Sequence, residues 1–123
     1  MIVRRILVVD DSAASRELLR HVLKGTCEEV VEAADGCEAL ERIAATLPDL
    51  VLLDLEMPRM DGYEVLRQVR HDPRWAATRV VAVTARAMQG DRDQALAAGF
   101  DGYITKPVSA SELREYLQRL KGE

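Results

Sequence analysis

The chain has 123 residues, of which 48% are apolar and 31% charged, with a formal net charge of −4. This length suits one domain, residues 1–123, that buries a sizeable core without disulfide bonds. The composition is that of an ordinary globular protein; it holds no apolar stretch of membrane length and no basic stripe, so we expect neither a membrane nor a direct nucleic-acid partner.

Five short apolar runs, rich in β-branched residues, are predicted to be strands: 6–9, 30–34, 50–53, 80–83 and 103–105. They are apolar at consecutive rather than alternate positions, which is typical of strands covered by helices on both faces. The sequence therefore predicts an α/β fold with a parallel sheet. Because the first run starts almost at the N-terminus, no signal peptide is expected, and we predict a cytoplasmic location.

Segments with helical periodicity follow each run. The first, 12–24, stops at Gly25, a residue suited to a left-handed cap. A later helix runs from about Met88 to just before Gly99, and the last lies near 111–120. Three further helix starts carry the capping-box spacing, namely Asp35 with Glu38, Asp61 with Glu64, and Ser109 with Glu112. Five strands thus alternate with five helices, joined by right-handed crossovers.

Four of the five predicted strands end at or next to polar residues. Asp10 and Asp11 follow the first, Asp54 the third, Thr84 the fourth and Lys106 the fifth. Ligands of open parallel sheets bind outside the carboxyl ends of the strands. We therefore expect these groups to share one edge of the sheet.

The chemistry of this group of residues indicates phosphoryl transfer. Two unit charges 4 Å apart cost about 4 kcal/mol at an effective dielectric near 20, so clustered carboxylates need a cation. Mg²⁺ (or Mn²⁺) fits, because it takes few carboxylates and leaves room for phosphate oxygens. Asp54 could attack phosphorus, while Lys106 and Thr84 supply positive charge and a hydroxyl donor.

Four motifs together resemble those of response-regulator receiver domains of two-component signalling. They are Val9-Asp10-Asp11, Asp54-Leu55-Glu56-Met57-Pro58-Arg59-Met60-Asp61-Gly62, Val83-Thr84-Ala85 and Lys106-Pro107. The resemblance covers essentially the whole chain. It implies a flavodoxin-like, doubly wound five-stranded parallel sheet, (βα)5, with strand order 2-1-3-4-5.

The resemblance also assigns roles at the site. Asp54 would be the phosphoacceptor, taking its phosphoryl group from a histidine kinase or a histidine phosphotransfer protein. Asp11 and Asp54 would bind Mg²⁺ directly, together with the backbone carbonyl of Glu56, while Asp10 acts through a bound water. The protein would catalyse only its own phosphorylation and dephosphorylation, and so would not be an enzyme in the usual sense.

Other implied roles concern switching. Thr84 and Lys106 would contact the phosphoryl group, and Pro107 would follow Lys106 through a cis peptide bond. Small Ala85 would keep the approach open. On phosphorylation Thr84 would move and Tyr103 would turn inward. The face of the fourth helix, fifth strand and fifth helix would then change its affinity for a downstream protein.

Glu56 and Arg86 occupy the two positions expected to modulate phosphoryl lifetime. Their opposite charges could pair and restrict the access of water to the site, or Glu56 could orient a hydrolytic water. Both interpretations fit the sequence. The phosphodonor is expected to be a four-helix bundle. Ala14, Leu18 and Pro107 are the candidate contacts with it, because two are compact and the third is apolar.

The remaining chemical side chains have simpler interpretations. His21 and His71 are predicted to be solvated helix residues, and Trp75 to pack on its own domain rather than anchor a partner. Cys27 and Cys37 match neither a metal nor a redox spacing and are expected to be reduced, partly buried thiols.

Three other functions fit the sequence less well. A haloacid-dehalogenase-type phosphatase also forms an aspartyl phosphate, but it carries a second Asp two residues after the nucleophile, on the first strand, where this chain has Glu56 on the third. A flavodoxin-like redox protein is disfavoured because the carboxylates would repel a flavin phosphate. An interaction module with a vestigial site is disfavoured because all five site residues are present. The chain could be a stand-alone switch or a receiver from a longer protein.

Overall fold

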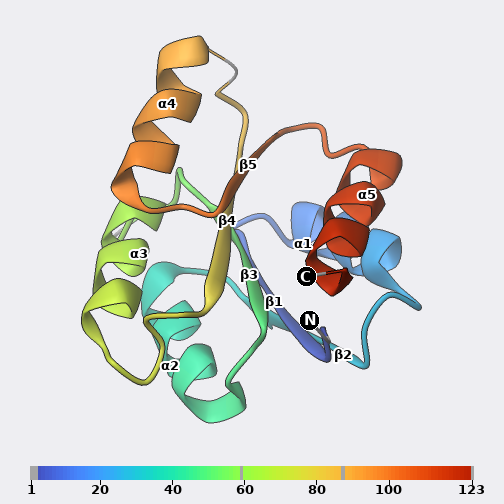
Figure 1. Ribbon diagram of the computed structural model, residues 1–123, viewed down its shortest axis with the longest axis horizontal. Helices are drawn as coiled ribbons and strands as arrows, with labels where there is room; N and C mark the ends of the chain where they lie inside the picture. Colours follow the sequence, from blue (N-terminus) through green and yellow to red (C-terminus); the bar gives the residue numbers. More distant parts are fainter. Residues whose placement is uncertain (1–2, 59, 87, 123) are drawn as a thin grey trace.

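The computed structural model describes residues 3–58, 60–86 and 88–122, within which five strands alternate with five helices (Figure 1). The strands are β1 (Arg5–Val9), β2 (Glu29–Ala33), β3 (Leu50–Asp54), β4 (Arg79–Thr84) and β5 (Gly102–Thr105). The helices are α1 (Ala13–Leu23), α2 (Gly36–Thr46), α3 (Gly62–His71), α4 (Gln89–Ala98) and α5 (Ala110–Lys121). All the predicted strands and helices are confirmed, with ends that move by one or two residues. None of these helices has the length and hydropathy needed to cross a bilayer.

The strands form one parallel sheet in the order β2-β1-β3-β4-β5, which confirms the predicted topology. β1 and β3 are neighbours although they are far apart in the chain, and Val9 pairs with Leu53. This register brings the loop that follows β1 beside the last residue of β3. On the other side of β3, Asp54 pairs with Val83 of β4.

Helices cover both faces of the sheet: α1 and α5 lie on one side, and α2, α3 and α4 on the other (Figure 1). Consecutive strand residues alternate between two hydrophobic clusters. Leu7 and Val9 pack with residues of α2 and α3, whereas Ile6 and Val8 pack with residues of α1 and α5. Because both faces are buried, β1 is apolar from Ile6 to Val9 and β3 from Leu50 to Leu53.

The helix ends follow the local sequence signals. The side chains of Asp35, Asp61 and Ser109 accept hydrogen bonds from the backbone N–H groups of Glu38, Glu64 and Glu112, as the capping-box spacing predicts. Gly25 and Gly99 both adopt positive φ, and Gly99 caps α4. Leu47, which caps α2 with φ 49°, was not expected there, because left-handed backbone is uncommon for a side chain of this size.

Side chains without an assigned role lie as follows. Trp75 packs against the core with the Arg74 guanidinium 4.7 Å above its ring, so the prediction that it contacts its own domain is confirmed. His21 and His71 are exposed on helices, also as predicted. Cys27 is half-buried, but Cys37 is exposed in the first turn of α2, so the expectation of partial burial is wrong for Cys37.

We predict that Gly62→Ala destabilises the fold. A Cβ at this first residue of α3 would lie 2.8 Å from the Asp54 carbonyl oxygen and 3.0 Å from the Leu55 Cα, so the backbone would have to shift. The expected loss is about 1 to 3 kcal/mol in the free energy of unfolding, measured by urea denaturation. Gly90→Ala in α4 is the control: its Cβ would meet nothing within 4 Å, and it should gain about 0.5 to 1 kcal/mol. Equal stability of the two variants would contradict this account of Gly62.

Candidate functional site

Three carboxylates converge at the carboxyl edge of the sheet. One oxygen from each of Asp10, Asp11 and Asp54 lies within 4.8 Å of the others. Asp10 and Asp54 are almost fully buried, at 1% and 5% exposure, whereas Asp11 is exposed. The neighbouring positions of β1 and β3 bring these residues together. The sequence-based expectation that they share one edge is therefore confirmed.

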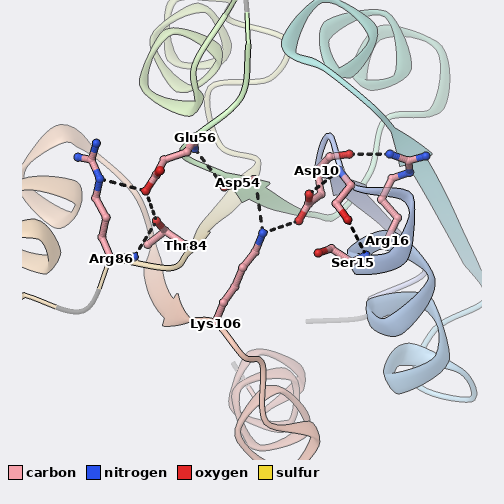
Figure 2. Close-up of polar contacts among 9 residues, drawn as sticks. Asp10, Ser15, Arg16, Asp54, Glu56, Thr84, Arg86 and Lys106 are labelled. Carbon is pink, nitrogen blue, oxygen red and sulfur yellow. Dashed lines mark hydrogen bonds and ion pairs between the residues drawn. The ribbon is translucent and has the colours of Figure 1, made fainter.

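Lys106 reaches into this cluster from the loop after β5 (Figure 2). Its Nζ lies 2.7 Å from Asp10 Oδ2 and 3.3 Å from Asp54 Oδ2. The Lys106 side chain is 26% exposed, so its charge remains open to solvent on one side. The ammonium group of Lys106 thus bonds two of the three carboxylates.

Backbone N–H groups hold the other oxygens of the two buried carboxylates. The Glu56 N–H donates to Asp54 Oδ1 at 3.0 Å, and the Ser12 N–H donates to Asp10 Oδ1 at 2.9 Å. Each buried carboxylate is therefore fixed by a backbone donor at one oxygen and by Lys106 at the other.

Burial dominates the ionisation of Asp54. It raises the pKa of this carboxyl, and the nearby Asp10 adds to the rise, while the Glu56 N–H and Lys106 oppose it. Burial also acts to lower the pKa of Lys106, but the hydrogen bond to Asp10 and the charge of Asp54 outweigh it, and that pKa is raised. Lys106 therefore stays protonated, and yet it does not cancel the cost of ionising Asp54.

This donor set fits a hard divalent cation. Carboxylate oxygens are the ligands that Mg²⁺ prefers, and the cluster combines two buried acidic groups with one open to solvent, where water or phosphate oxygens could complete the coordination. Burial and Asp10 disfavour the ionised form of Asp54, and a cation bound beside it would favour that form.

Thr84, at the end of β4, is fully buried and faces the loop after β3. Its hydroxyl lies 3.5 Å from Glu56 Oε1 and accepts a hydrogen bond from the Arg86 N–H at 3.2 Å. Arg86 Nε also donates to Glu56 Oε1 at 3.0 Å (Figure 2). The two residues expected to modulate phosphoryl lifetime therefore form an ion pair, and Glu56 contacts the Thr84 hydroxyl as well.

Tyr103 of β5 is connected to the same loop. Its ring is half-buried against the core cluster, and its hydroxyl donates to the Arg86 backbone carbonyl at 2.5 Å. Arg86 thus contacts Thr84 through its amide, Glu56 through its guanidinium and Tyr103 through its carbonyl. Ala85, which lies between Thr84 and Arg86 in the chain, is exposed.

The candidate partner contacts lie beside the cluster. The Lys106–Pro107 peptide bond is cis, which is the geometry implied by the resemblance, and Pro107 is exposed. Leu18 is 50% exposed, so the buried stripe of α1 does not include it. Leu18 and Pro107 share a surface hollow of about 360 Å³, and Ala14 is exposed one turn earlier on α1.

Two residues that contact the cluster were missed by sequence reasoning. Ser12 was interpreted only as part of a helix start, but its N–H holds Asp10. Arg16, on α1, donates from Nη1 to the Asp10 backbone carbonyl at 2.7 Å. No motif marks Arg16. The available signal was its position in the first turns of the helix that follows the paired acidic residues.

Comparison with known proteins identifies the family. Residues 6–118 match the response regulator receiver domain. The response regulator PleD of Caulobacter vibrioides is 45% identical over 104 residues, which are 85% of this chain and 23% of PleD. The response regulator MprA of Mycobacterium avium is 44% identical over 123 residues, covering 97% of this chain and 53% of MprA. The chain thus spans about a quarter and about half of these two relatives.

The fold is also similar to that of a known response regulator. The crystal structure of the chemotaxis response regulator CheY4 of Vibrio cholerae superposes with a TM-score of 0.87 at 31% sequence identity, covering 96% of this chain and 98% of that one. Sequence match, strand order and fold likeness agree, and the chain belongs to the family of response regulator receiver domains.

Proposed function

We propose that this protein is a cytoplasmic, phosphorylation-activated signalling switch that accepts a phosphoryl group on Asp54 from a phosphohistidine of a histidine kinase or a histidine phosphotransfer protein. The observation that carries the proposal is the convergence of Asp10, Asp11 and Asp54, two of which bond the ammonium of Lys106. Membership in the receiver family gives the proposal its class of reaction.

Mg²⁺ is the proposed cofactor. Asp11 and Asp54 would hold it directly together with the Glu56 backbone carbonyl, and Asp10 would act through a bound water. When bound, the ion supplies the positive charge that the three carboxylates lack and that a transferring phosphoryl group requires. The exposed carboxylate of Asp11 leaves this side of the cluster accessible.

In the proposed reaction, one carboxylate oxygen of Asp54 attacks phosphorus, and the bond between phosphorus and the donor nitrogen breaks. The electron pair and a proton remain with the departing imidazole. Lys106, already 3.3 Å from Asp54 Oδ2, is placed to neutralise a phosphoryl oxygen, and Thr84 would donate its hydroxyl to another. Later attack of water on phosphorus restores the Asp54 carboxylate and releases phosphate.

The proposed output begins at Thr84. To donate to a phosphoryl group, its hydroxyl must leave Glu56 and the Arg86 N–H, and Arg86 also carries the carbonyl that holds Tyr103. Tyr103 borders a hollow of about 350 Å³ between α4, β5 and α5, together with Leu96 and Tyr116. We propose that this face binds the downstream protein target, with an affinity that depends on phosphorylation.

The phosphatase of haloacid-dehalogenase type is not supported. Asp54 ends the third strand in the chain, and the residue two positions later, Glu56, pairs with Arg86 rather than facing Asp54 with its carboxylate. The family match covers nearly the whole chain and names a receiver.

Phosphorylation tests the proposal directly. Incubation with acetyl phosphate and Mg²⁺ should add one phosphoryl group, seen by intact mass, and chelation of Mg²⁺ should abolish the gain. Asp54→Asn should show none, because the nucleophilic oxygen is lost. Asp49→Asn, whose carboxylate accepts from the Arg4 and Arg5 N–H groups at the opposite end of β1, is the matched control and should be labelled. Labelling of Asp54→Asn, or sustained phosphate release from a phosphomonoester, would overturn the proposal.

Charge removal at Asp54 should stabilise the metal-free protein. Burial raises the pKa of Asp54, so its ionised form weakens folding at neutral pH, and this penalty disappears as pH falls through the folded-state pKa. With a chelator present, Asp54→Asn should therefore unfold at a higher urea concentration than wild type at pH 7. The difference should shrink at acidic pH. Asp11→Asn, at an exposed position, should change the midpoint less. A lower midpoint for Asp54→Asn at pH 7 would contradict this electrostatic account.

The ion pair between Glu56 and Arg86 favours the interpretation in which both side chains restrict water. Glu56→Ala and Arg86→Ala should then shorten the half-life of the radiolabelled phosphoprotein to a similar extent, because each removes the same pair. If Glu56 instead orients a hydrolytic water, Glu56→Ala should lengthen the half-life and Arg86→Ala should not. An unchanged half-life in both variants would exclude any role for the pair.

A further inference from the structure

Arg16 links the acidic loop to the neighbouring strand. From α1, its Nη1 donates to the Asp10 backbone carbonyl at 2.7 Å, and its Nε donates to Glu32 Oε1 on β2 at 3.2 Å (Figure 2 shows the first contact). The side chain is only 18% exposed. Glu32 Oε2 is held in turn by Arg20, one turn further along α1.

The carbonyl that Arg16 holds belongs to the peptide group between Asp10 and Asp11. The preceding N–H of Asp10 is fixed to the Ala33 carbonyl at 3.1 Å, and Asp10 Oδ1 is fixed by the Ser12 N–H. The orientation of the intervening peptide group decides where Asp11 points. Arg16 is thus the side chain that fixes this peptide group, at the turn where a buried carboxylate is followed by an exposed one.

We propose that Arg16 is a positioning residue for cation binding: by holding the Asp10 carbonyl, it keeps the Asp11 carboxylate directed toward Asp10 and Asp54. This inference rests on the proposed function, because it concerns the Mg²⁺ site of that switch. The forked guanidinium can reach two acceptors at once from different nitrogens, and the Glu32 contact aims it. A lysine could keep the charge but only one of these directed contacts.

The direction of the change in Mg²⁺ affinity distinguishes a positioning role of Arg16 from a purely electrostatic one. Removing a positive charge near an acidic cluster strengthens cation binding by simple electrostatics. Loss of a residue that orients the ligands weakens it. Arg20 supplies the matched control, because it carries the same charge and bonds the same Glu32 carboxylate, whereas Arg16 also bonds the Asp10 carbonyl.

The experiment measures Mg²⁺ affinity by isothermal titration calorimetry on the full chain, with the urea midpoint of the metal-free protein measured in parallel. Arg16→Met should raise the Mg²⁺ dissociation constant by about tenfold. Arg16→Lys should fall between wild type and Arg16→Met. Arg20→Met should leave the dissociation constant unchanged or slightly lower it, whatever its effect on stability.

Wild-type affinity in Arg16→Met, or equal weakening in Arg20→Met, would overturn the role of Arg16 while leaving the proposed switch intact. Should Arg16→Met fail to fold, the comparison of Arg16→Lys with wild type decides: weaker Mg²⁺ binding supports the role, and equal binding overturns it. A wild-type protein that neither binds Mg²⁺ nor is labelled by acetyl phosphate would overturn the proposed function and this inference together.

Discussion

Repulsion between carboxylates that the fold itself forces together is the interaction on which the site depends. Asp10 and Asp54 are buried close together because β1 and β3 are neighbours in the sheet. Lys106 and two backbone N–H groups offset part of this repulsion. The remaining excess of negative charge is the feature that would attract a cation to this edge of the sheet.

The sequence could predict the features that depend on residues close together in the chain or on a general rule of sheet packing. The cap at Asp35 depends on residues three apart, and the apolar runs depend on burial of both strand faces, so both could be predicted without coordinates. The convergence of the acidic residues followed from a rule about parallel sheets. Leu47 precedes Pro48, which disfavours a further helical residue at this position, but the sequence did not predict left-handed backbone there.

The parts of the site that the sequence could not predict are long-range contacts made by flexible side chains. Glu56 could be assigned to the site from the sequence, but its contact with the Thr84 hydroxyl depends on side-chain rotamers in the loop after β3 and at the end of β4. Arg16 reaches a carbonyl oxygen, and every residue in the chain has one, so residue type could not indicate its target. Exposure of Cys37 likewise depends on which side of α2 faces the sheet at its first turn.

The polar contacts around Thr84 explain how one event at Asp54 could reach the surface. The Thr84 hydroxyl can donate one hydrogen, and in this structure Glu56 is the acceptor beside it. A phosphoryl group on Asp54 would compete with Glu56 for that hydrogen. If the hydroxyl turns, the Arg86 N–H loses its acceptor, and the loop whose carbonyl holds Tyr103 loses one of its attachments. Because Arg86 contacts Thr84, Glu56 and Tyr103, the proposed signal needs no large rearrangement, only a change of partner at each of a few shared atoms.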